Sequence, residues 1–149
     1  MMPVGLEIKE MTLKDCSQVA KVEESCFSVP WSLKSFEDTF LYQGNHYLTA
    51  WSGDKIIGFI GMMAVGEEAD ITNVAVLPTY RKEGIASLLV KEILDVAVKY
   101  KIHKILLEVR ASNKAAIRLY EKYEFHFLST RNNYYEMPTE DADIMCWSN

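Results

Sequence analysis

The sequence has few cysteines, no long apolar run and no apolar leader, and each absence excludes a class of protein. Its three cysteines, Cys16, Cys26 and Cys146, form no CxxC pair, which argues against a disulfide framework or a structural zinc site and favours the reducing cytosol. The first residues, MMPVGLEIKEM, carry Glu7 and Glu10 where a signal peptide needs an apolar core, and no run is long enough to span a membrane. These absences predict a soluble, cytoplasmic protein with no membrane partner.

The net charge and the absence of known motifs exclude further classes of ligand. The formal net charge of −5 argues against non-specific nucleic-acid binding, which needs a basic face. Neither the Walker A pattern GxxxxGK[ST] nor the dinucleotide pattern GxGxxG occurs. The histidines, His46, His103 and His126, are scattered without metal-ligand spacing, so no metal is expected. With 149 residues and no repeat or linker, the chain is expected to form one domain, 1–149.

The periodicity of the apolar residues predicts the order of elements. It favours helices at 12–27, 32–42, 85–100 and 113–123, the first with a capping start at Thr12 and Asp15. Short β-type runs predict strands at 6–10, 46–51, 56–65, 70–77, 103–109, 125–131 and 143–147. Two consecutive hairpins indicate a meander, and the later strand–helix–strand order requires at least one parallel pair. The predicted fold class is α+β, with a mixed, mostly antiparallel central sheet and helices on its faces.

The stretch RKEGIA, residues 81–86, lies at the start of the third predicted helix. A helix N-terminus offers about four unpaired backbone N–H groups and a partial positive charge, so anions bind there readily. Arg81 and Lys82 add two cations, Gly84 permits a positive φ, and the small Ala86 leaves room for a ligand. This combination suits a pyrophosphate. The alternative is a solvated basic turn, and Glu83 would oppose an anion unless it points outward.

RKEGIA also fits the pattern [QR]xxGx[GA], and the chain resembles the GNAT superfamily of N-acetyltransferases in its whole order of elements. That resemblance implies that residues 81–86, with Ser87 beside them, wrap the pyrophosphate of acetyl-coenzyme A; a first-turn role for Ser87 is the alternative. It also implies a sheet splayed between its fourth and fifth strands, with a bulge in the strand ITNVAVLP. The contacts implied for the pantetheine arm and thioester come from Val74, Ala75 and Val76, with a backbone N–H near Val76 polarising the thioester carbonyl. The residues implied for the pyrophosphate are Arg81, Lys82, Glu83, Gly84, Ile85 and Ala86.

Four further stretches resemble one branch of that superfamily. LLEVRASNKAAIRLYEKYEF, TRNNYY, EDADIM and CFSVPWS are similar to the ribosomal-protein-alanine N-acetyltransferases, which act on the N-terminal alanine of a small-subunit ribosomal protein in bacteria. The resemblance implies a protein N-terminus as partner, that of a ribosomal protein, and no direct contact with nucleic acid. Glu124 is a departure, because the family has glycine in the turn before Phe125, and it predicts a strained or reshaped turn.

Glu108 is a carboxylate in the apolar strand ILLEV, and two interpretations fit it. An ion pair with Arg110, two residues along the same face, would be structural. A general base would remove the proton from an α-amino group, whose pKa of about 8 keeps much of it protonated at neutral pH. From the residues alone the two are balanced, and the resemblance assigns Glu108 as the base.

Tyr120, in IRLYEKY, could be an ordinary core tyrosine or the acid that protonates the departing coenzyme A thiolate, the role that the resemblance assigns to it. Asn113 reads as an N-cap, and by resemblance also as a cofactor contact. Trp31 and Tyr134, with Tyr135, are aromatic residues in predicted loops. They either cover the edge of the core or, by resemblance, frame the peptide channel.

Two rival functions remain open on the sequence. The first is acetylation of a small-molecule amine by the same fold, since the loops with Trp31 and Tyr134 would decide between a peptide and a small amine. The second is a non-catalytic module that binds coenzyme A and a protein partner. Glu108 and Tyr120 argue against the second, because a binding module needs neither a base nor an acid.

Overall fold

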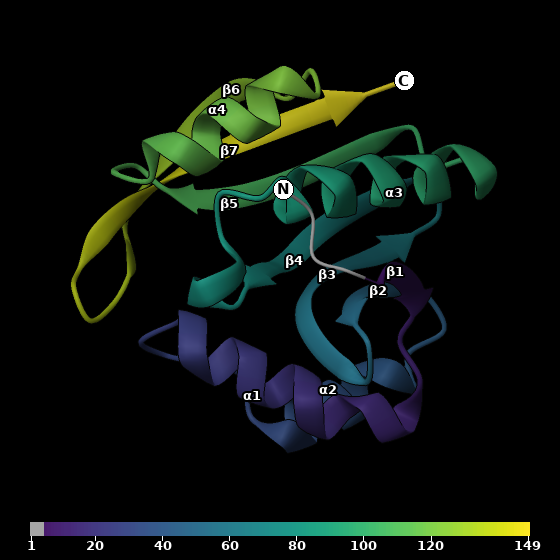
Figure 1. The fold of residues 1–149 in the computed structure, drawn as a ribbon. Coiled ribbons are helices and arrows are strands. Elements are labelled where there is room, and N and C mark those ends of the chain that lie inside the picture. The colour runs from purple at the N-terminus through teal and green to yellow at the C-terminus, as the bar shows by residue number, and fades with distance from the viewer. Residues whose placement is uncertain (1–4) are drawn as a thin grey trace.

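The computed structural model describes residues 5–149 and contains a seven-stranded sheet with helices on both faces (Figure 1). The strand order is β1-β2-β3-β4-β5-β7-β6. The strands are β1 (Leu6–Glu10), β2 (Asn45–Ser52), β3 (Lys55–Val65), β4 (Glu68–Val76), β5 (Lys104–Arg110), β6 (His126–Tyr135) and β7 (Glu140–Ser148). The helices are α1 (Cys16–Cys26), α2 (Leu33–Phe40), α3 (Ile85–Lys99) and α4 (Lys114–Lys122), with 3-10 turns η1 (Leu13–Asp15) and η2 (Pro78–Tyr80).

The sheet is mixed, as the sequence predicts. β4 and β5 pair in parallel, whereas the other neighbouring strands pair antiparallel. The α+β fold class and the predicted order of elements are therefore confirmed. None of the helices within residues 5–149 combines the length and apolar character that a membrane crossing requires.

Alternating side chains of the strands build one apolar core on each face of the sheet. On one face, α1 and α2 cover a cluster that includes Val19, Phe36 and Phe59, all fully buried. On the other face, α3 packs with Leu89 and Ile93 on the sheet, and residues of α4 join the same cluster. Figure 1 shows the two layers, with α1 and α2 together at the bottom of the view and apart from α3 and α4.

The predicted capping starts are present. Thr12 and Asp15 form a capping box, with the Thr12 N–H donating to Asp15 Oδ2 at 2.9 Å. The Ser32 hydroxyl accepts from the Ser35 N–H at 3.1 Å, and Asn113 Oδ1 accepts from the Ala116 N–H at 3.2 Å. The first predicted helix begins as the 3-10 turn η1 before α1, so the predicted start at residue 12 is the cap rather than helix.

The predictions were wrong about the length of the last hairpin. β6 continues to Tyr135 and β7 begins at Glu140, so Tyr134 lies in a strand and not in a loop. The polar run RNN lowered the local strand signal, but cross-strand pairing, which reaches Tyr135 and Glu140, overrides it. A register shift between Arg131 and Tyr135 accommodates the irregular part of β6.

The β4–β5 pairing ends early, and a bulge in β4 accompanies the end. Residues 68–71 of β4 pair with residues 104–107 of β5, and no pairing follows the Ile71–Leu107 pair. On the other side of β4, Ile71 pairs with Met62 and Asn73 with Gly61, so Thr72 is the extra residue of a β-bulge. The splay between the fourth and fifth strands is confirmed, and so is the bulge.

The bulge changes which face of the sheet the β4 side chains occupy. Ile71 and Val74 both belong to the α3 side of the sheet although they are three residues apart. Ala75 belongs to the α1 side instead. A regular strand would put residues an odd number apart on opposite faces, so the extra residue inverts the alternation from Thr72 onward.

The end of α4 is closed by a Schellman motif. The Phe125 N–H donates to the Tyr120 carbonyl at 3.0 Å and the Glu124 N–H donates to the Glu121 carbonyl at 2.9 Å. The rings of Tyr120 and Phe125 contact each other with centroids 5.8 Å apart. Glu124 takes the left-handed position of this motif with φ 70°, so the turn before Phe125 is strained, as predicted.

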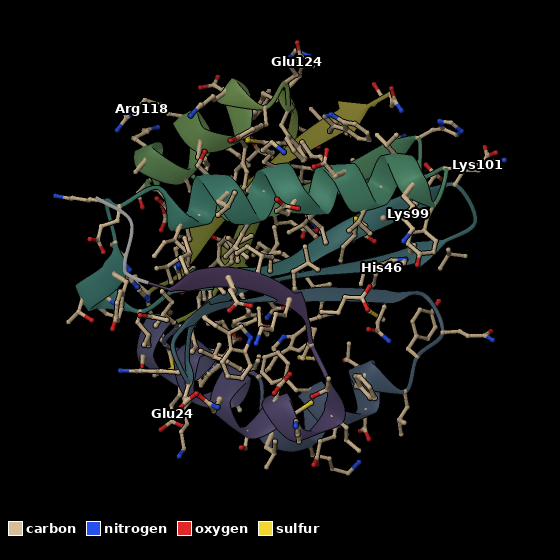
Figure 2. The ribbon with its side chains drawn as sticks, turned by 45° about the vertical axis from the view of Figure 1, so that its right-hand side comes forward. Glu24, His46, Lys99, Lys101, Arg118 and Glu124 are labelled. Carbon is tan, nitrogen blue, oxygen red and sulfur yellow. The ribbon has the colours of Figure 1, made fainter. Side chains whose placement is uncertain are left out.

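We predict that Glu124→Gly stabilises the protein by about 1 kcal/mol. A left-handed conformation costs an L-residue about 1–2 kcal/mol, and part of the gain is offset by the greater freedom of glycine in the unfolded chain. The Glu124 side chain is exposed and points away from the body of the protein (Figure 2), so the change removes no packing. Urea unfolding measures the difference. Glu124→Ala is the control, because it keeps the Cβ and is expected to show no gain; equal stabilisation by both variants would contradict the strain argument.

Candidate active site

The loop before α3 ends in a helix start whose backbone N–H groups are free. Gly84 is the N-cap residue with φ 84° and ψ 8°, a left-handed conformation that needs no Cβ. Lys82 also has a positive φ, of 65°. The first helical hydrogen bond runs from the Leu88 N–H to the Gly84 carbonyl, and no described side chain caps the helix. The N–H groups of residues 85–87 therefore point outward from a 15-residue helix and can hold an anion.

The side chains of the predicted loop have different environments. Lys82 and Gly84 are exposed, Glu83 and Ala86 are partly buried, and Ile85 is buried in the core, so Ile85 offers the loop its backbone only. Arg81 Nε donates to the Val76 carbonyl at 3.0 Å and so ties the loop to the end of β4. The remaining guanidinium N–H groups are available for a ligand.

Lys122, in α4, and Tyr123, its C-cap residue, both contact the start of α3. The sequence did not predict either residue as part of the site. The Tyr123 hydroxyl lies 2.6 Å from the Ser87 hydroxyl, and Lys122 Nζ donates to that hydroxyl at 3.5 Å. Lys122 thereby adds a cation beside the free N–H groups. No local signal indicates this, because the contact joins residues 35 positions apart in the chain.

The backbone of β4 faces the gap beyond the last β4–β5 pair. The Leu77 N–H donates to the Ile57 carbonyl at 2.8 Å, so by strand alternation the polar groups of Ala75 point to β3 and those of Val74 and Val76 point to β5. The β5 ladder has already ended at Leu107, so it offers them no partner. The Val76 carbonyl accepts from the Arg81 and Cys26 side chains instead. The gap is thus bordered by backbone groups that an extended ligand can pair with.

Glu108 is the first residue of β5 beyond that ladder. Leu107 is buried on the α3 side of the sheet, so Glu108 points to the α1 side by strand alternation. Its side chain is 29% exposed, which leaves the carboxylate accessible. It forms an ion pair with Arg131 of β6 at 3.4 Å.

The predicted structural alternative for Glu108, an ion pair with Arg110, is wrong. Arg110 pairs with Glu140 at 3.3 Å, donates to the carbonyls of Pro138 and Glu136 at 2.9 Å each, and stacks on the ring of Tyr135. An ion pair along one strand competes with pairs to neighbouring strands that lie closer. For Arg110, the tip of the β6–β7 hairpin supplies the closer partners. Arg110 therefore anchors the hairpin tip.

Tyr120 lies on the opposite side of the sheet from Glu108. It is 7% exposed and packs in the core under α3, as the structural interpretation predicts. No residue within 5–149 forms a hydrogen bond with its hydroxyl, and burial raises its pKa well above the usual range for a phenol. A buried phenol of this kind stays protonated at neutral pH and has a free donor to offer a ligand.

The two aromatic loop candidates lie in different settings. Trp31 is partly buried, packs on Phe36 with ring centroids 5.4 Å apart, and belongs to the core on the α1 side. Its backbone N–H donates to Glu23 Oε2 at 3.0 Å. Tyr134 is 44% exposed, and Arg131 lies over its ring at 4.9 Å. Arg131 thus connects Tyr134 to Glu108, a link between two predicted site residues.

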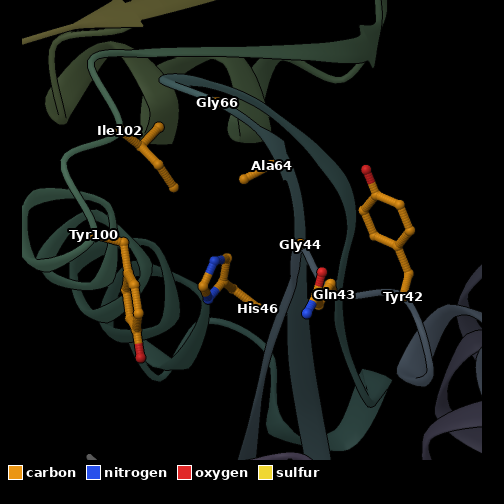
Figure 3. Close-up of a pocket in the computed structure, with 8 residues that line it drawn as sticks. All are labelled: Tyr42, Gln43, Gly44, His46, Ala64, Gly66, Tyr100 and Ile102. Atoms are coloured by element: carbon orange, nitrogen blue, oxygen red, sulfur yellow. The ribbon is translucent and has the colours of Figure 1, made fainter.

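A separate cavity of about 430 Å³ lies away from these residues (Figure 3). The His46 and Tyr100 rings face each other across part of it with centroids 4.7 Å apart, and burial lowers the pKa of His46. None of the predicted site residues lines this cavity. The residues that line it are Tyr42, Gln43, Gly44, His46, Ala64, Gly66, Tyr100 and Ile102.

Among the described residues, the cysteines form no disulfide and the acidic residues form no metal-binding cluster. All three thiols are free, Cys16 being buried and Cys26 and Cys146 partly buried. In the described part of the chain, no group of three or more His, Cys, Asp or Glu side chains is arranged to hold a metal ion.

Comparison with known proteins relates this geometry to characterised enzymes. A profile of the Acetyltransferase (GNAT) family matches residues 16–125. Ribosomal protein bS18-alanine N-acetyltransferase of Escherichia coli K12 is 35% identical over 144 residues, which cover 93% of this chain and 94% of the relative. The crystal structure of the Escherichia coli ribosomal-protein-S18-alanine N-acetyltransferase superimposes with a TM-score of 0.90 at 31% identity, covering 96% of this chain and 93% of the other. Naa50 of Arabidopsis thaliana, solved with the bisubstrate analogue CoA-Ac-MVNAL, gives a TM-score of 0.87 at 25% identity and covers 98% and 100%.

Proposed function

Because this chain belongs to the Acetyltransferase (GNAT) family, we propose that it transfers the acetyl group of acetyl-CoA to the N-terminal alanine of a small-subunit ribosomal protein. The observation that carries the proposal is the meeting of three features at one gap in the sheet. These are the free helix start of α3, the part of β4 from Val74 to Val76 that has no β5 partner, and the Glu108 carboxylate. The region similar to the bS18-alanine enzyme covers 93% of the chain and so spans the residues of all three features.

Acetyl-CoA fits the residues on the α3 side of the gap. The N–H groups of residues 85–87, with the cations of Arg81, Lys82 and Lys122, would hold its pyrophosphate. The backbone of Val74, which has no strand partner on the β5 side, would pair with the amides of the pantetheine arm, and the Val76 N–H would donate to the thioester carbonyl. Acetyl-CoA would supply the activated acetyl group. Ser87, in the first turn of α3, and Asn113, the N-cap of α4, are proposed as further cofactor contacts, and both also hydrogen-bond within the protein.

Glu108 is proposed as the general base. The α-amino group of a peptide has a pKa of about 8, so it must lose a proton before it can attack the thioester carbon. Glu108 lies at the gap, is accessible from the α1 side, and takes that proton directly or through one water molecule. The free electron pair of the nitrogen then forms the new amide bond while the carbon–sulfur bond breaks.

Tyr120 is proposed as the donor to the departing sulfur. Burial keeps its proton in place at neutral pH, and its hydroxyl has no partner among the described residues. The same burial disfavours the charged tyrosinate that full proton transfer would leave. Tyr120 therefore stabilises the sulfur by donating a hydrogen bond to it. A coenzyme A thiolate of intrinsic pKa near that of cysteine, about 8.5, is stabilised by such a donor.

The peptide would approach from the α1 side. Trp31 borders that side of the sheet, and Tyr134 on β6 is joined to Glu108 through Arg131. Aromatic residues beside a base, one exposed and one partly buried, provide a surface that a peptide N-terminus can pack on. In this arrangement the peptide and the cofactor reach the gap from opposite faces of the sheet.

We predict that Glu108→Gln lowers the rate of acetyl transfer at neutral pH by about 100-fold or more, because general-base catalysis contributes about 10²–10⁴-fold. Affinity for acetyl-CoA should stay within about twofold, since the cofactor residues are unchanged. The loss should shrink toward pH 9–10, where the amine is already deprotonated. Steady-state kinetics of thiol release measures all three. Glu121→Gln, on the exposed side of α4, is the matched control, and unchanged turnover of Glu108→Gln would exclude Glu108 as the base.

The proposed substrate is tested with a panel of amines read by mass spectrometry and thiol release. A peptide with the N-terminal sequence of ribosomal protein bS18 should be acetylated on its α-amino group. The same peptide blocked at its N-terminus, and a polyamine such as spermidine, should be poor substrates. Preference for the polyamine would favour small-molecule acetylation, and binding of acetyl-CoA without any turnover would favour a non-catalytic module.

A further inference from the structure

Glu23 is a buried carboxylate whose role the proposed mechanism leaves unexplained. It lies near the end of α1 and is 2% exposed. Asp15 is also buried, but its carboxylate completes the capping box with Thr12. A carboxylate in the interior costs several kcal/mol unless it is well paired, and apolar residues of similar volume often stabilise such a position better. The presence of Glu23 therefore calls for a reason beyond packing.

The contacts of Glu23 connect two parts of the site. Its Oε2 accepts from the Trp31 N–H at 3.0 Å, and its Oε1 accepts from Asn73 Nδ2 at 3.1 Å. Trp31 belongs to the loop between α1 and α2 on the proposed peptide side. Asn73 follows the bulge residue Thr72 and precedes Val74, the first of the unpaired β4 residues at the gap.

A second pair of hydrogen bonds fixes the strand end of this connection. The Tyr47 hydroxyl donates to Asn73 Oδ1 at 3.3 Å and lies 2.6 Å from Thr72 Oγ1. The ionised Glu23 carboxylate can only accept, so it faces the amide nitrogen of Asn73, and the Asn73 oxygen faces the Tyr47 hydroxyl. Burial raises the pKa of Tyr47 to about 12, so the hydroxyl remains a donor. The bulge, Asn73, Glu23 and the Trp31 loop thus form one continuous buried network.

We propose that Glu23 is a positioning residue that ties the peptide-binding loop at Trp31 to the β4 bulge, and so holds the peptide wall at a fixed distance from the thioester. This inference rests on the proposed peptide acetyltransferase function. Burial raises the pKa of the Glu23 carboxyl, while the bonds from Trp31 and Asn73 oppose that rise. Both partners are donors, so only a side chain with two acceptor oxygens satisfies both.

Glutamine is the sharpest substitution because it keeps the size of Glu23 but replaces one acceptor by a donor. In Glu23→Gln, either the Trp31 N–H or Asn73 Nδ2 then meets an NH₂ group, so that bond is lost or the Asn73 amide must turn over and rearrange its bonds with Tyr47. We expect KM for the N-terminal peptide to rise about tenfold, the scale of effect when a positioned group shifts by part of an ångström. KM for acetyl-CoA should change less than about twofold, because the α3 loop is untouched.

Asp15→Asn is the matched control, because it weakens another buried carboxylate of the same region without touching the site. Urea unfolding should show a loss of stability in both variants, whereas peptide KM should rise in Glu23→Gln only. An unchanged peptide KM in Glu23→Gln, or an equal rise in Asp15→Asn, would show that Glu23 only stabilises the fold. Either result would overturn the proposal.

A measurement independent of turnover tests the connection itself. Asn73→Ala leaves the bond between Glu23 and Trp31 in place but removes the strand end of the network. If Glu23 couples the two parts, amide hydrogen exchange at Trp31 should accelerate in this variant by about tenfold. Unchanged exchange at Trp31 would show that the loop is held without the strand and would contradict the proposal. A chain that acetylates no peptide, yet shows this acceleration, would refute the proposed substrate and leave the coupling intact.

Discussion

The parallel pairing of β4 with β5 stops at Ile71 and Leu107, and the rest of the site depends on that early end. A strand in the middle of a sheet normally satisfies its backbone groups on both sides. Beyond the Thr72 bulge, β4 keeps β3 as a partner and loses β5, so the backbone of Val74 and the Val76 N–H have no strand partner on that side. An extended ligand with amide groups is the partner that restores this pairing, and the pantetheine arm of acetyl-CoA is such a ligand.

The two faces of the sheet divide the proposed work at this gap. The α3 side carries the helix start at Gly84, whose first N–H groups no described side chain caps, and the buried Tyr120, which lies in the Schellman-capped helix α4. The α1 side carries Glu108, Trp31 and the buried Glu23 network. Because the gap passes through the sheet, a nucleophile from one face can meet an acyl donor held on the other. The cavity beside His46 is lined by none of these residues.

Much of this arrangement could be predicted from the sequence, since its signals are local. Thr12, Ser32 and Asn113 are capping residues next to apolar periodic runs, and they start helices where the pattern predicts. RKEGIA contains both the glycine and the cations of the α3 start. What could not be predicted are contacts set by tertiary packing. Arg131 pairs with Glu108 from another strand, and Lys122 reaches Ser87 from another helix.

Glu23 shows the same limit most clearly. In sequence it is one of two adjacent glutamates in an amphipathic helix, and nothing local separates it from Glu24. Helix α1 turns Glu23 toward β4 and leaves Glu24 exposed, and only the fold shows that difference. The length of β6 was likewise determined by its pairing with β7 and by the Arg110 anchor, against a polar local sequence.

Amide hydrogen exchange at β4, with and without acetyl-CoA, tests the central claim most directly. The amides of Val74 and Val76 should exchange rapidly in the free protein, because they face the gap, and should slow markedly when acetyl-CoA is added. Ala75, whose amide points to β3, should be protected in both states. Protection of Val74 and Val76 that is already high without ligand, or that acetyl-CoA leaves unchanged, would contradict the account.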